Sequence, residues 1–533
     1  MKVLLVTGQM AKDIVTGYAM KAPVDTTTLA LPISVASFLT PGFVAAQLRK
    51  HNVKDFDLIL VPGAMKGDVS LVAATIGRPT FKGPTHASEL PWVLGCLDQI
   101  ELSTTASASS AIAESMRQRF EVDLSQARIV EQESGQADRF YIGSGRTKLA
   151  VGRGFPMKVL AEIVDAPKRS DNEIAVRAKY YADSGADVID LGMVAGNPQA
   201  DRVRKMIEAV RSSVDLPVSI DTFDPKEIEA SASAGIDLVL SLDNGNVREV
   251  APFVQDIPVV ITPTDVSKGM MPSTPISRVR SLYRNIEKAR QLGIEKIVAD
   301  PILEPLIHPG LLPSLETYQM WSQRYEHVPM LFGIGNVTEL IDADSVGVNA
   351  LLAMIGGELG ASLLLAPETS DKATGTIREL AVAARMYSVA SRRKTPPKDL
   401  GMDLLILKEK RMNADICPLA GTTVSGALPE VDGYEWVRDP SGWFRITINR
   451  TSGLIALSHF SGSSDDKPSA VLVAPEARTL YVAAIERALL SRLDHAAYLG
   501  SELQKAETAL RTGRSYVQDA ELFKKTVSSH GRA

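Results

Sequence analysis

Carboxylate and amide side chains recur through the middle of the 533-residue chain, each just after a short apolar run. The clearest case is Val218-Ser-Ile-Asp-Thr-Phe223, in which Asp221 ends a segment with the composition of a buried strand. Such a set suits a ligand with alternating hydrogen-bond donors and acceptors, because a carboxylate accepts from paired N–H groups and an amide serves either role. A 2-amino-4-oxo-pterin is a ligand of this kind.

The other polar residues of this set also follow apolar runs. These polar residues include no HExxH motif, no cysteine pair and no Ser/His/Asp order, so neither a zinc hydrolase nor an acyl-transfer triad is indicated. Asp190 lies inside its apolar run, and a hydrogen-bonded core acid and a pocket acid both remain open for it. In chain order the set is Glu162, Asp165, Asp190, Asn197, Asp221, Asp243, Asn244, Asn246, Thr262, Thr264, Asp265, Asp300, Asn336 and Glu368.

These residues need a scaffold that brings the ends of many strands together. Eight short apolar segments, each followed by a polar tip and an amphipathic helix, predict a (β/α)₈ TIM barrel, in which the carboxyl ends of the strands form the active site. The predicted strands are Val159–Asp165, Asp187–Met193, Pro217–Asp221, Asp237–Asp243, Ile257–Pro263, Lys296–Ile302, Pro329–Gly335 and Ala361–Pro367.

Two further domains are expected beside the barrel, which we place at residues 151–393. Residues 1–150 alternate short strands with helices, which predicts a Rossmann-like α/β domain with strands at Val3–Val6, Thr28–Pro32, Leu58–Val61 and Ile100–Leu102. Residues 394–533 begin with a linker and then carry a hairpin signal and two helical segments, which predicts a small α+β domain.

The composition argues against nucleic-acid binding and membrane association. A formal charge of −5 and 5% aromatic residues give neither a basic field nor stacking platforms for nucleic acid, so we expect no nucleic-acid partner. No apolar run approaches the roughly 20 residues of a membrane span, so we expect no membrane partner. Cys96 and Cys417 lie far apart in the sequence, which is typical of a reduced cytoplasm, and we expect a cytoplasmic location.

Three short motifs resemble the pterin-binding barrels, which include dihydropteroate synthase and the pterin-dependent corrinoid methyltransferases. They are Ser219-Ile-Asp-Thr222, Ala299-Asp-Pro301 and Gly333-Ile-Gly-Asn336. The resemblance implies that Asp221 and Asp300 hold the amino and ring nitrogens of a pterin. It also implies that Asn336 and either Asn244 or Asn246 complete the contacts to its edge.

The three-domain layout is similar to dihydropteroate synthase-like proteins associated with tetrahydromethanopterin synthesis. This implies condensation of 6-hydroxymethyl-7,8-dihydropterin diphosphate with an aromatic amine, 4-(β-D-ribofuranosyl)aminobenzene 5′-phosphate, and release of pyrophosphate. The alternative acceptor is 4-aminobenzoate. The expected partners are the pterin and the amine, and we expect the protein to form a homodimer.

The chain departs from dihydropteroate synthases at two strand ends. Asn336 stands where these enzymes usually carry a lysine, and Leu365-Ala-Pro-Glu368 replaces their Arg-x-His. The seventh strand end looks more like that of the methyltransferases. A pterin-dependent methyltransferase and a non-catalytic pterin-binding protein therefore stay open as alternatives.

Without that lysine and the Arg-x-His, other residues must neutralise the negative charge of the departing diphosphate. Lys168 and Arg169, in the loop after the first predicted barrel strand, are candidate catalytic cations, although a surface turn is an equal alternative. Asn197 and His308 are candidates for phosphate contacts. A magnesium ion held by Glu162, Asp165 or the diphosphate itself would serve the same purpose.

Overall fold

The computed structural model describes residues 1–133, 140–408, 437–450, 452–462 and 467–523. The chain forms two compact units, Met1–Leu404 and Leu405–Ala533. The first unit contains the barrel and a smaller parallel sheet, and the second contains an antiparallel sheet with two helices. The predicted boundary at residue 150, within the first unit, stays a prediction.

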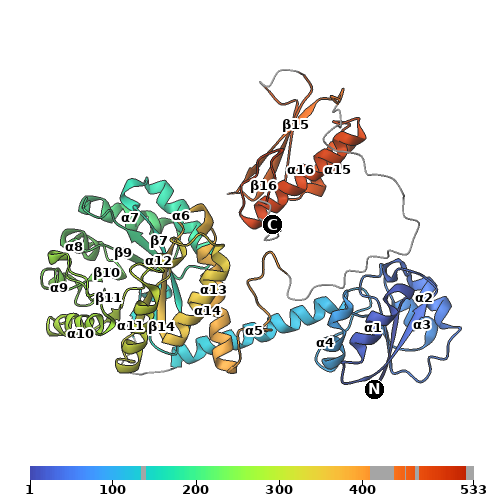
Figure 1. The fold of residues 1–533 in the computed structure, drawn as a ribbon, viewed down its shortest axis with the longest axis horizontal. Helices are drawn as coiled ribbons and strands as arrows, with labels where there is room; N and C mark the ends of the chain where they lie inside the picture. The colour runs from blue at the N-terminus through green and yellow to red at the C-terminus, as the bar shows by residue number, and fades with distance from the viewer. Residues whose placement is uncertain (134–139, 409–436, 451, 463–466, 524–533) are drawn as a thin grey trace, which may run out of the picture. The chain divides into compact units, whose positions relative to one another are not determined.

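The predicted (β/α)₈ barrel is confirmed. Eight parallel strands close in the order β10-β11-β12-β13-β14-β7-β8-β9, and helices surround them (Figure 1). The strands are β7 (Lys158–Ile163), β8 (Val188–Gly192), β9 (Val218–Asp221), β10 (Leu238–Leu242), β11 (Val259–Ile261), β12 (Ile297–Ala299), β13 (Met330–Gly333) and β14 (Ala361–Pro367). The helices are α6 (Asp171–Ser184), α7 (Ala200–Ser213), α8 (Pro225–Ser233), α9 (Val247–Val254), α10 (Pro275–Gln291), α11 (Leu311–Arg324), α12 (Gly335–Thr338), α13 (Ser345–Leu359) and α14 (Thr376–Arg393).

Local sequence signals set the helix starts near the strand tips. Ser170 caps α6 by accepting from the backbone N–H of Glu173, whose side chain accepts in return from Ser170. Asp224 caps α8 by accepting from the N–H groups of Lys226 and Glu227. These caps fix where each chain segment turns from strand to helix, and thus where each polar tip lies.

The lower interior of the barrel is an apolar floor. One interior side chain of most strands joins a buried cluster with Ile142 and Val151. Those two residues come from a small hairpin, β5 (Phe140–Ile142) and β6 (Leu149–Val151), so the segment before β7 packs against the barrel interior. The strand members of the floor are Leu160, Val188, Leu238, Leu240, Val260, Val298, Leu331 and Leu363.

The N-terminal part of the first unit contains a four-stranded parallel sheet in the order β2-β1-β3-β4. The predicted strand at Ile100–Leu102 is wrong: the fourth strand is Thr80–Lys82, and the carbonyl oxygen of Ser103 accepts from the Lys82 N–H. A three-residue strand ending in lysine gives too short an apolar run to be recognised. The elements are β1 (Lys2–Gly8), β2 (Asp25–Leu31), β3 (Leu58–Val61), β4 (Thr80–Lys82), α1 (Lys12–Ala19), α2 (Pro41–Leu48), α3 (Ser70–Ile76), α4 (Leu90–Gly95) and α5 (Ala108–Glu133).

The second unit is an α+β fold, as expected. The predicted hairpin is β15 (Trp443–Asn449) with β16 (Leu454–Phe460), and β17 (Ala470–Ala474) adds a third antiparallel strand that the sequence reading missed. Two helices, α15 (Ala477–Glu486) and α16 (Leu493–Thr512), bury their apolar faces with this sheet. Across the described parts of both units, no helix is long and apolar enough to cross a membrane.

Candidate functional site

A layer of carboxylates lies directly above the apolar floor. Successive strand side chains point to opposite faces, so a residue two positions beyond an interior residue also faces the interior. Glu162 stands in this relation to Leu160, Asp190 to Val188 and Asp300 to Val298. The acids therefore face the inside of the barrel near the carboxyl ends of its strands, where sites in this fold form.

Three acids form a cluster that we call the carboxylate triad: Glu162, Asp190 and Asp221. One oxygen from each lies within 4.8 Å of the others. Glu162 and Asp190 are register partners on β7 and β8, and Asp221 ends the neighbouring strand β9. Among the residues that the structure describes, no lysine, arginine or histidine forms an ion pair with any of the three.

Asp190 is the deepest member of the triad and is fully buried. Its Oδ1 accepts a hydrogen bond of 2.6 Å from Ser219 Oγ. Its Oδ2 is also buried but has no hydrogen-bond partner among the described residues. A buried carboxylate oxygen without a donor is costly, so this atom favours a proton or a bound ligand beside it.

Burial and mutual repulsion change the acidity of the triad. Burial raises the pKa of Glu162 to about 7, and the charges of Asp221 and Asp165 add to the shift. Burial raises the pKa of Asp221 to about 6. The pKa of Asp190 lies well above its ordinary value because of burial and the charges of Asp221 and Glu162. Three close carboxylates without a cation resist full ionisation.

A glycine makes room for the triad. A Cβ atom at Gly192 would overlap the Glu162 carboxylate, mainly at Oε1. Gly192 pairs with Asp221 in the barrel register, so the space it leaves lies between the two acids. The glycine is thus needed for close approach of a side chain rather than for a turn.

Asp300 follows β12 and is held in place by its neighbours. Its Oδ1 accepts from the Ile302 N–H at 2.8 Å and from the Tyr318 hydroxyl at 3.0 Å. Burial raises the pKa of Asp300 to about 6, although these hydrogen bonds oppose the shift; the charge of Asp221 adds to it. Ile302 has a left-handed φ of 68°, a strained conformation that is typical of functional sites.

The three candidate asparagines have different surroundings. Asn246 is buried, and its amide bonds the backbone of Asp243, Phe223 and Ser241, so it ties the ends of β9 and β10 together. Asn244 donates to Asp265 at 2.7 Å and accepts from a lysine of α10. Asn336 is exposed, and its Nδ2 donates to the Leu303 carbonyl oxygen at 2.8 Å.

The candidate cations lie on the loop after β7. Lys168 pairs with Asp165 at 2.8 Å, and both side chains are largely exposed. Arg169 donates from Nε to the Val164 carbonyl oxygen at 3.2 Å, which orients its guanidinium. The two candidates for phosphate contacts, Asn197 and His308, are exposed on the loops after β8 and β12.

The predicted magnesium ligands are separated by the fold. Glu162 belongs to the triad, whereas Asp165 is outside it and is paired with Lys168. Carboxylate oxygens are the donors that magnesium prefers, and the unpartnered oxygen of Asp190 adds such a donor beside Glu162. The carboxylates of Glu162, Asp190 and Asp221 therefore fit the ion, and the pair Glu162 and Asp165 stays a prediction.

Other acids at the strand tips have structural roles. Asp243 accepts from the N–H groups of Gly245 and Val266 and from the Thr264 hydroxyl. Glu368 accepts from the N–H of Ile377 and thereby caps the start of α14. The sequence reading missed the roles of Gly192, Ser219 and Tyr318; a Gly two residues after Asp190 was the one available signal.

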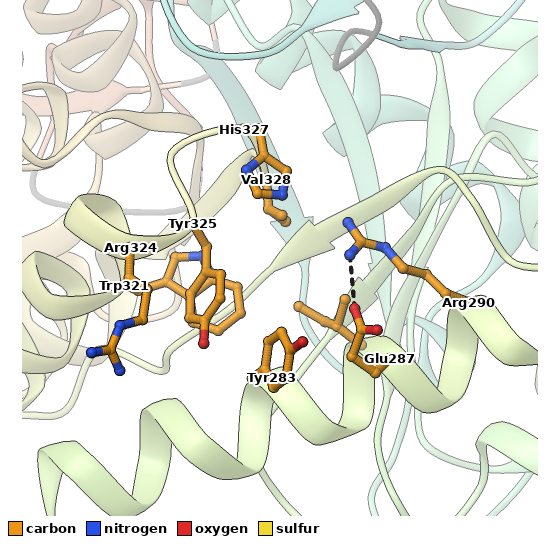
Figure 2. A pocket seen from close by; sticks show the side chains of 9 residues that line it. Tyr283, Glu287, Arg290, Trp321, Arg324, Tyr325, His327 and Val328 are labelled. Carbon is orange, nitrogen blue, oxygen red and sulfur yellow. Dashed lines mark hydrogen bonds and ion pairs between the residues drawn. The ribbon is translucent and has the colours of Figure 1, made fainter.

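A separate hollow of about 290 Å³ lies on the outside of the barrel, between α10 and α11 (Figure 2). Its aromatic side chains pack on one another, with the Tyr283 and Tyr325 rings stacked at 5.0 Å and Trp321 against Tyr325 at 4.5 Å. His327 and Val328 precede β13, so the hollow lies at the end of the strands opposite to the acids. It is not part of the site.

Three parts of the chain match known protein families. Residues 164–312 match a family described as pterin binding enzyme, and residues 438–519 match one described as PterinBD-DUF4346. Residues 1–85 match a family of unknown function.

One relative matches nearly the whole chain, and others match parts of it. An uncharacterized protein of Methanocaldococcus jannaschii is 39% identical over 536 residues, which covers 98% of this chain and 99% of that protein. A dihydropteroate synthase of Clostridium beijerinckii is 35% identical over 85 residues, or 14% of this chain and 32% of that enzyme. The structure of a Yersinia pestis DHPS with a pterine-sulfa conjugate has a TM-score of 0.38 and 20% identity, and covers 48% of this chain and 100% of that one.

Proposed function

The chain belongs to the dihydropteroate synthase-like pterin-binding proteins, and from this premise we propose that it transfers a dihydropterin-6-ylmethyl group to an aromatic amine. The donor is 6-hydroxymethyl-7,8-dihydropterin diphosphate. The bond from the methylene carbon to the amine nitrogen forms, the bond from that carbon to the diphosphate oxygen breaks, and the amine nitrogen then loses a proton to solvent.

One observation carries the proposal. Asp221 and Asp300, from the non-adjacent strands β9 and β12, both face the barrel interior above an apolar floor. Their charges are close enough that Asp221 raises the pKa of Asp300. A flat heterocycle with N–H groups on its edge fits both the apolar floor and the two acids. Its faces are apolar, and its edge donates to carboxylates.

Each group has a role in this reaction. Asp221 and Asp300 accept from the pterin's amino and ring N–H groups, and Asn336 and Asn244 contact the rest of its edge. Catalysis comes mainly from orientation of the methylene carbon toward the amine, which is already neutral at pH 7 and needs no strong base. Lys168 and Arg169 stabilise the charge that develops on the departing diphosphate.

Magnesium is the metal of this proposal, with Glu162 and Asp165 as its predicted ligands. When bound, it supplies positive charge that offsets the charge of the diphosphate.

The acceptor we propose is 4-(β-D-ribofuranosyl)aminobenzene 5′-phosphate, which places the reaction in tetrahydromethanopterin synthesis, in the cytoplasm. The exposed Asn197 and His308, on loops at the barrel mouth, would meet its phosphate. We also propose that the protein works as a homodimer.

A second candidate function follows from Asn336. This exposed residue, in α12 just after β13, stands where dihydropteroate synthases usually have a lysine. The methyltransferases of this superfamily use an asparagine to contact a reduced pterin nitrogen. Methyl transfer from a methyl-tetrahydropterin to an acceptor on a partner protein is therefore the alternative. A non-catalytic pterin carrier is the third, because no Arg-x-His follows β14.

One assay separates the three. The purified protein is mixed with dihydropterin diphosphate, magnesium and either amine, and pyrophosphate is measured. A synthase releases pyrophosphate only when an amine is present, and Asp221→Asn loses this release while Asp215→Asn, at the opposite end of the same strand, keeps it. Methyl transfer without pyrophosphate release would instead support the methyltransferase, and pterin binding without either product would support the carrier.

A further inference from the structure

We propose that Glu162, Asp190 and Asp221 together form a divalent-cation site of the magnesium class, which binds its ion before any substrate arrives. The inference builds on the proposed function, in which magnesium offsets the charge of the diphosphate. It replaces the pair Glu162 and Asp165 by a site on three adjacent strands.

The spacing of the oxygens fits an ion. Ligand oxygens on opposite sides of magnesium lie about 4 Å apart, and those around calcium about 5 Å, because the metal–oxygen distances are about 2.1 and 2.4 Å. One oxygen from each triad residue lies within 4.8 Å of the others, so a single ion between them reaches all three with small side-chain movements.

The unpartnered oxygen of Asp190 points to a ligand independently of this spacing. Ser219 satisfies Oδ1 at 2.6 Å, and the described residues offer no donor to the buried Oδ2. A buried carboxylate is normally paired, protonated or bound to a metal. Since Glu162 and Asp221 are themselves acids, they cannot donate to Oδ2 when ionised, whereas a cation satisfies all three residues at once.

Charge in the surroundings favours a cation as well. Lys168 pairs with Asp165, and Arg278 pairs with Glu304 at 2.9 Å; among the described residues, no ion pair joins a cation to the triad. A cation bound between the three acids would offset the negative charges that they bring close together.

Gly192 is part of the same site. Because a Cβ at this position would overlap the Glu162 carboxylate, the glycine lets Glu162 lie inward beside Asp221. Without that space Glu162 would have to turn away from the other two acids.

The test measures metal binding without pterin, so that its failure is distinct from failure of the proposed function. Full-length protein is stripped with a chelator and titrated with Mn²⁺, with free Mn²⁺ followed by electron paramagnetic resonance and Mg²⁺ added as a competitor. We expect one Mn²⁺ per chain, displaced by Mg²⁺. Glu162→Gln and Asp190→Asn should each weaken binding at least tenfold, whereas Asp165→Asn should leave it unchanged.

One measurement and one further variant guard against a folding defect. Thermal unfolding of each variant shows whether it folds, and Glu162→Gln, at the partly exposed edge of the triad, is the variant least at risk. Gly192→Ala keeps all three acids and should also weaken Mn²⁺ at least tenfold. Absence of stoichiometric Mn²⁺ binding by the wild-type protein would overturn the inference, as would loss of binding in Asp165→Asn together with retention in Asp190→Asn.

The result for the ion does not depend on the result for the pterin. If Mn²⁺ binds the triad but no reduced pterin binds the protein, the cation site stands and the proposed function fails. If a pterin binds and Mn²⁺ does not, the triad holds protons only and the inference fails.

Discussion

The carboxylate of Glu162 lies in the space that a side chain at Gly192 would occupy. Gly192 ends β8 and pairs in register with Asp221, so this space determines whether an acid from β7 can meet an acid from β9. Gly192 therefore determines how close the negative charges of Glu162 and Asp221 can lie.

Gly192→Ala should destabilise the protein by no more than about 1 kcal/mol, the low end of the cost of overpacking, because the atom that a Cβ would overlap is the end of the flexible Glu162 side chain, which can rotate away. Urea unfolding followed by circular dichroism measures the change. Gly347→Ala is the control, because Gly347 lies in α13, a Cβ added there would meet no atom within 4 Å, and alanine favours the helix. A loss of more than about 3 kcal/mol would mean that the Glu162 side chain cannot move out of this space.

Asp221→Asn and Asp300→Asn should each weaken binding of a reduced pterin roughly 10- to 100-fold. A hydrogen bond to a charged group contributes about 1.5–3 kcal/mol, and about 1.4 kcal/mol corresponds to a factor of ten. Isothermal titration calorimetry gives the affinities, with Asp215→Asn as the matched control. Unchanged affinity in both site variants would remove the two acids from the pterin contacts.

Asp300 should make folding stability depend on pH. Its pKa is raised from 3.8 to about 6, so between these values the folded protein holds a proton that the unfolded chain has lost. Stability therefore falls as the pH rises through this window, by at most about 3 kcal/mol, and stays lower above it. Urea unfolding of wild-type and Asp300→Asn protein at pH 4 and pH 7 tests the sign. The wild-type protein should lose more stability than the variant over this interval.

Tyr318→Phe should raise the pKa of Asp300. The Tyr318 hydroxyl lies 3.0 Å from Asp300 Oδ1 and 2.9 Å from the Leu331 carbonyl oxygen and gives its one hydrogen to either acceptor. Its hydrogen bond to Asp300 lowers the pKa of that carboxyl. Removing it should raise that pKa and cost about 1–3 kcal/mol of stability because a buried acceptor is left unpaired. The pH at which pterin affinity is half-maximal should move upward in Tyr318→Phe. Tyr283→Phe, at the hollow outside the barrel, should leave it in place.

Lys168→Ala should slow amine-dependent pyrophosphate release without changing stability by more than about 0.5 kcal/mol. The Lys168–Asp165 pair is exposed, and such pairs contribute little to folding. Lys296→Ala, at the opposite end of the barrel strands, is the control for the loss of one positive charge. If both variants release pyrophosphate at the wild-type rate, Lys168 has no role in neutralising the leaving group.

The barrel was predictable because its signals are local. Each strand is a short buried run, and each run ends in a polar tip before a helix, so hydrophobic periodicity is enough to count the eight units. The same reasoning placed Asp221 and Asp300 at strand tips, where alternation of side chains alone sends them inward. It failed at Thr80–Lys82 and at β17, where the strands are short or lie beside stronger helical signals.

The sequence by itself determined which residues end the strands, and so which acids and amides were available to a pterin. Only the tertiary structure decided which of them meet. Asp190 joins Glu162 and Asp221 because β7, β8 and β9 are neighbours in a particular register, and Asp165 is excluded because its loop turns it toward Lys168. Hydrophobic periodicity specifies the face of a strand, whereas contacts between strands depend on register, loop conformation and the space left by Gly192.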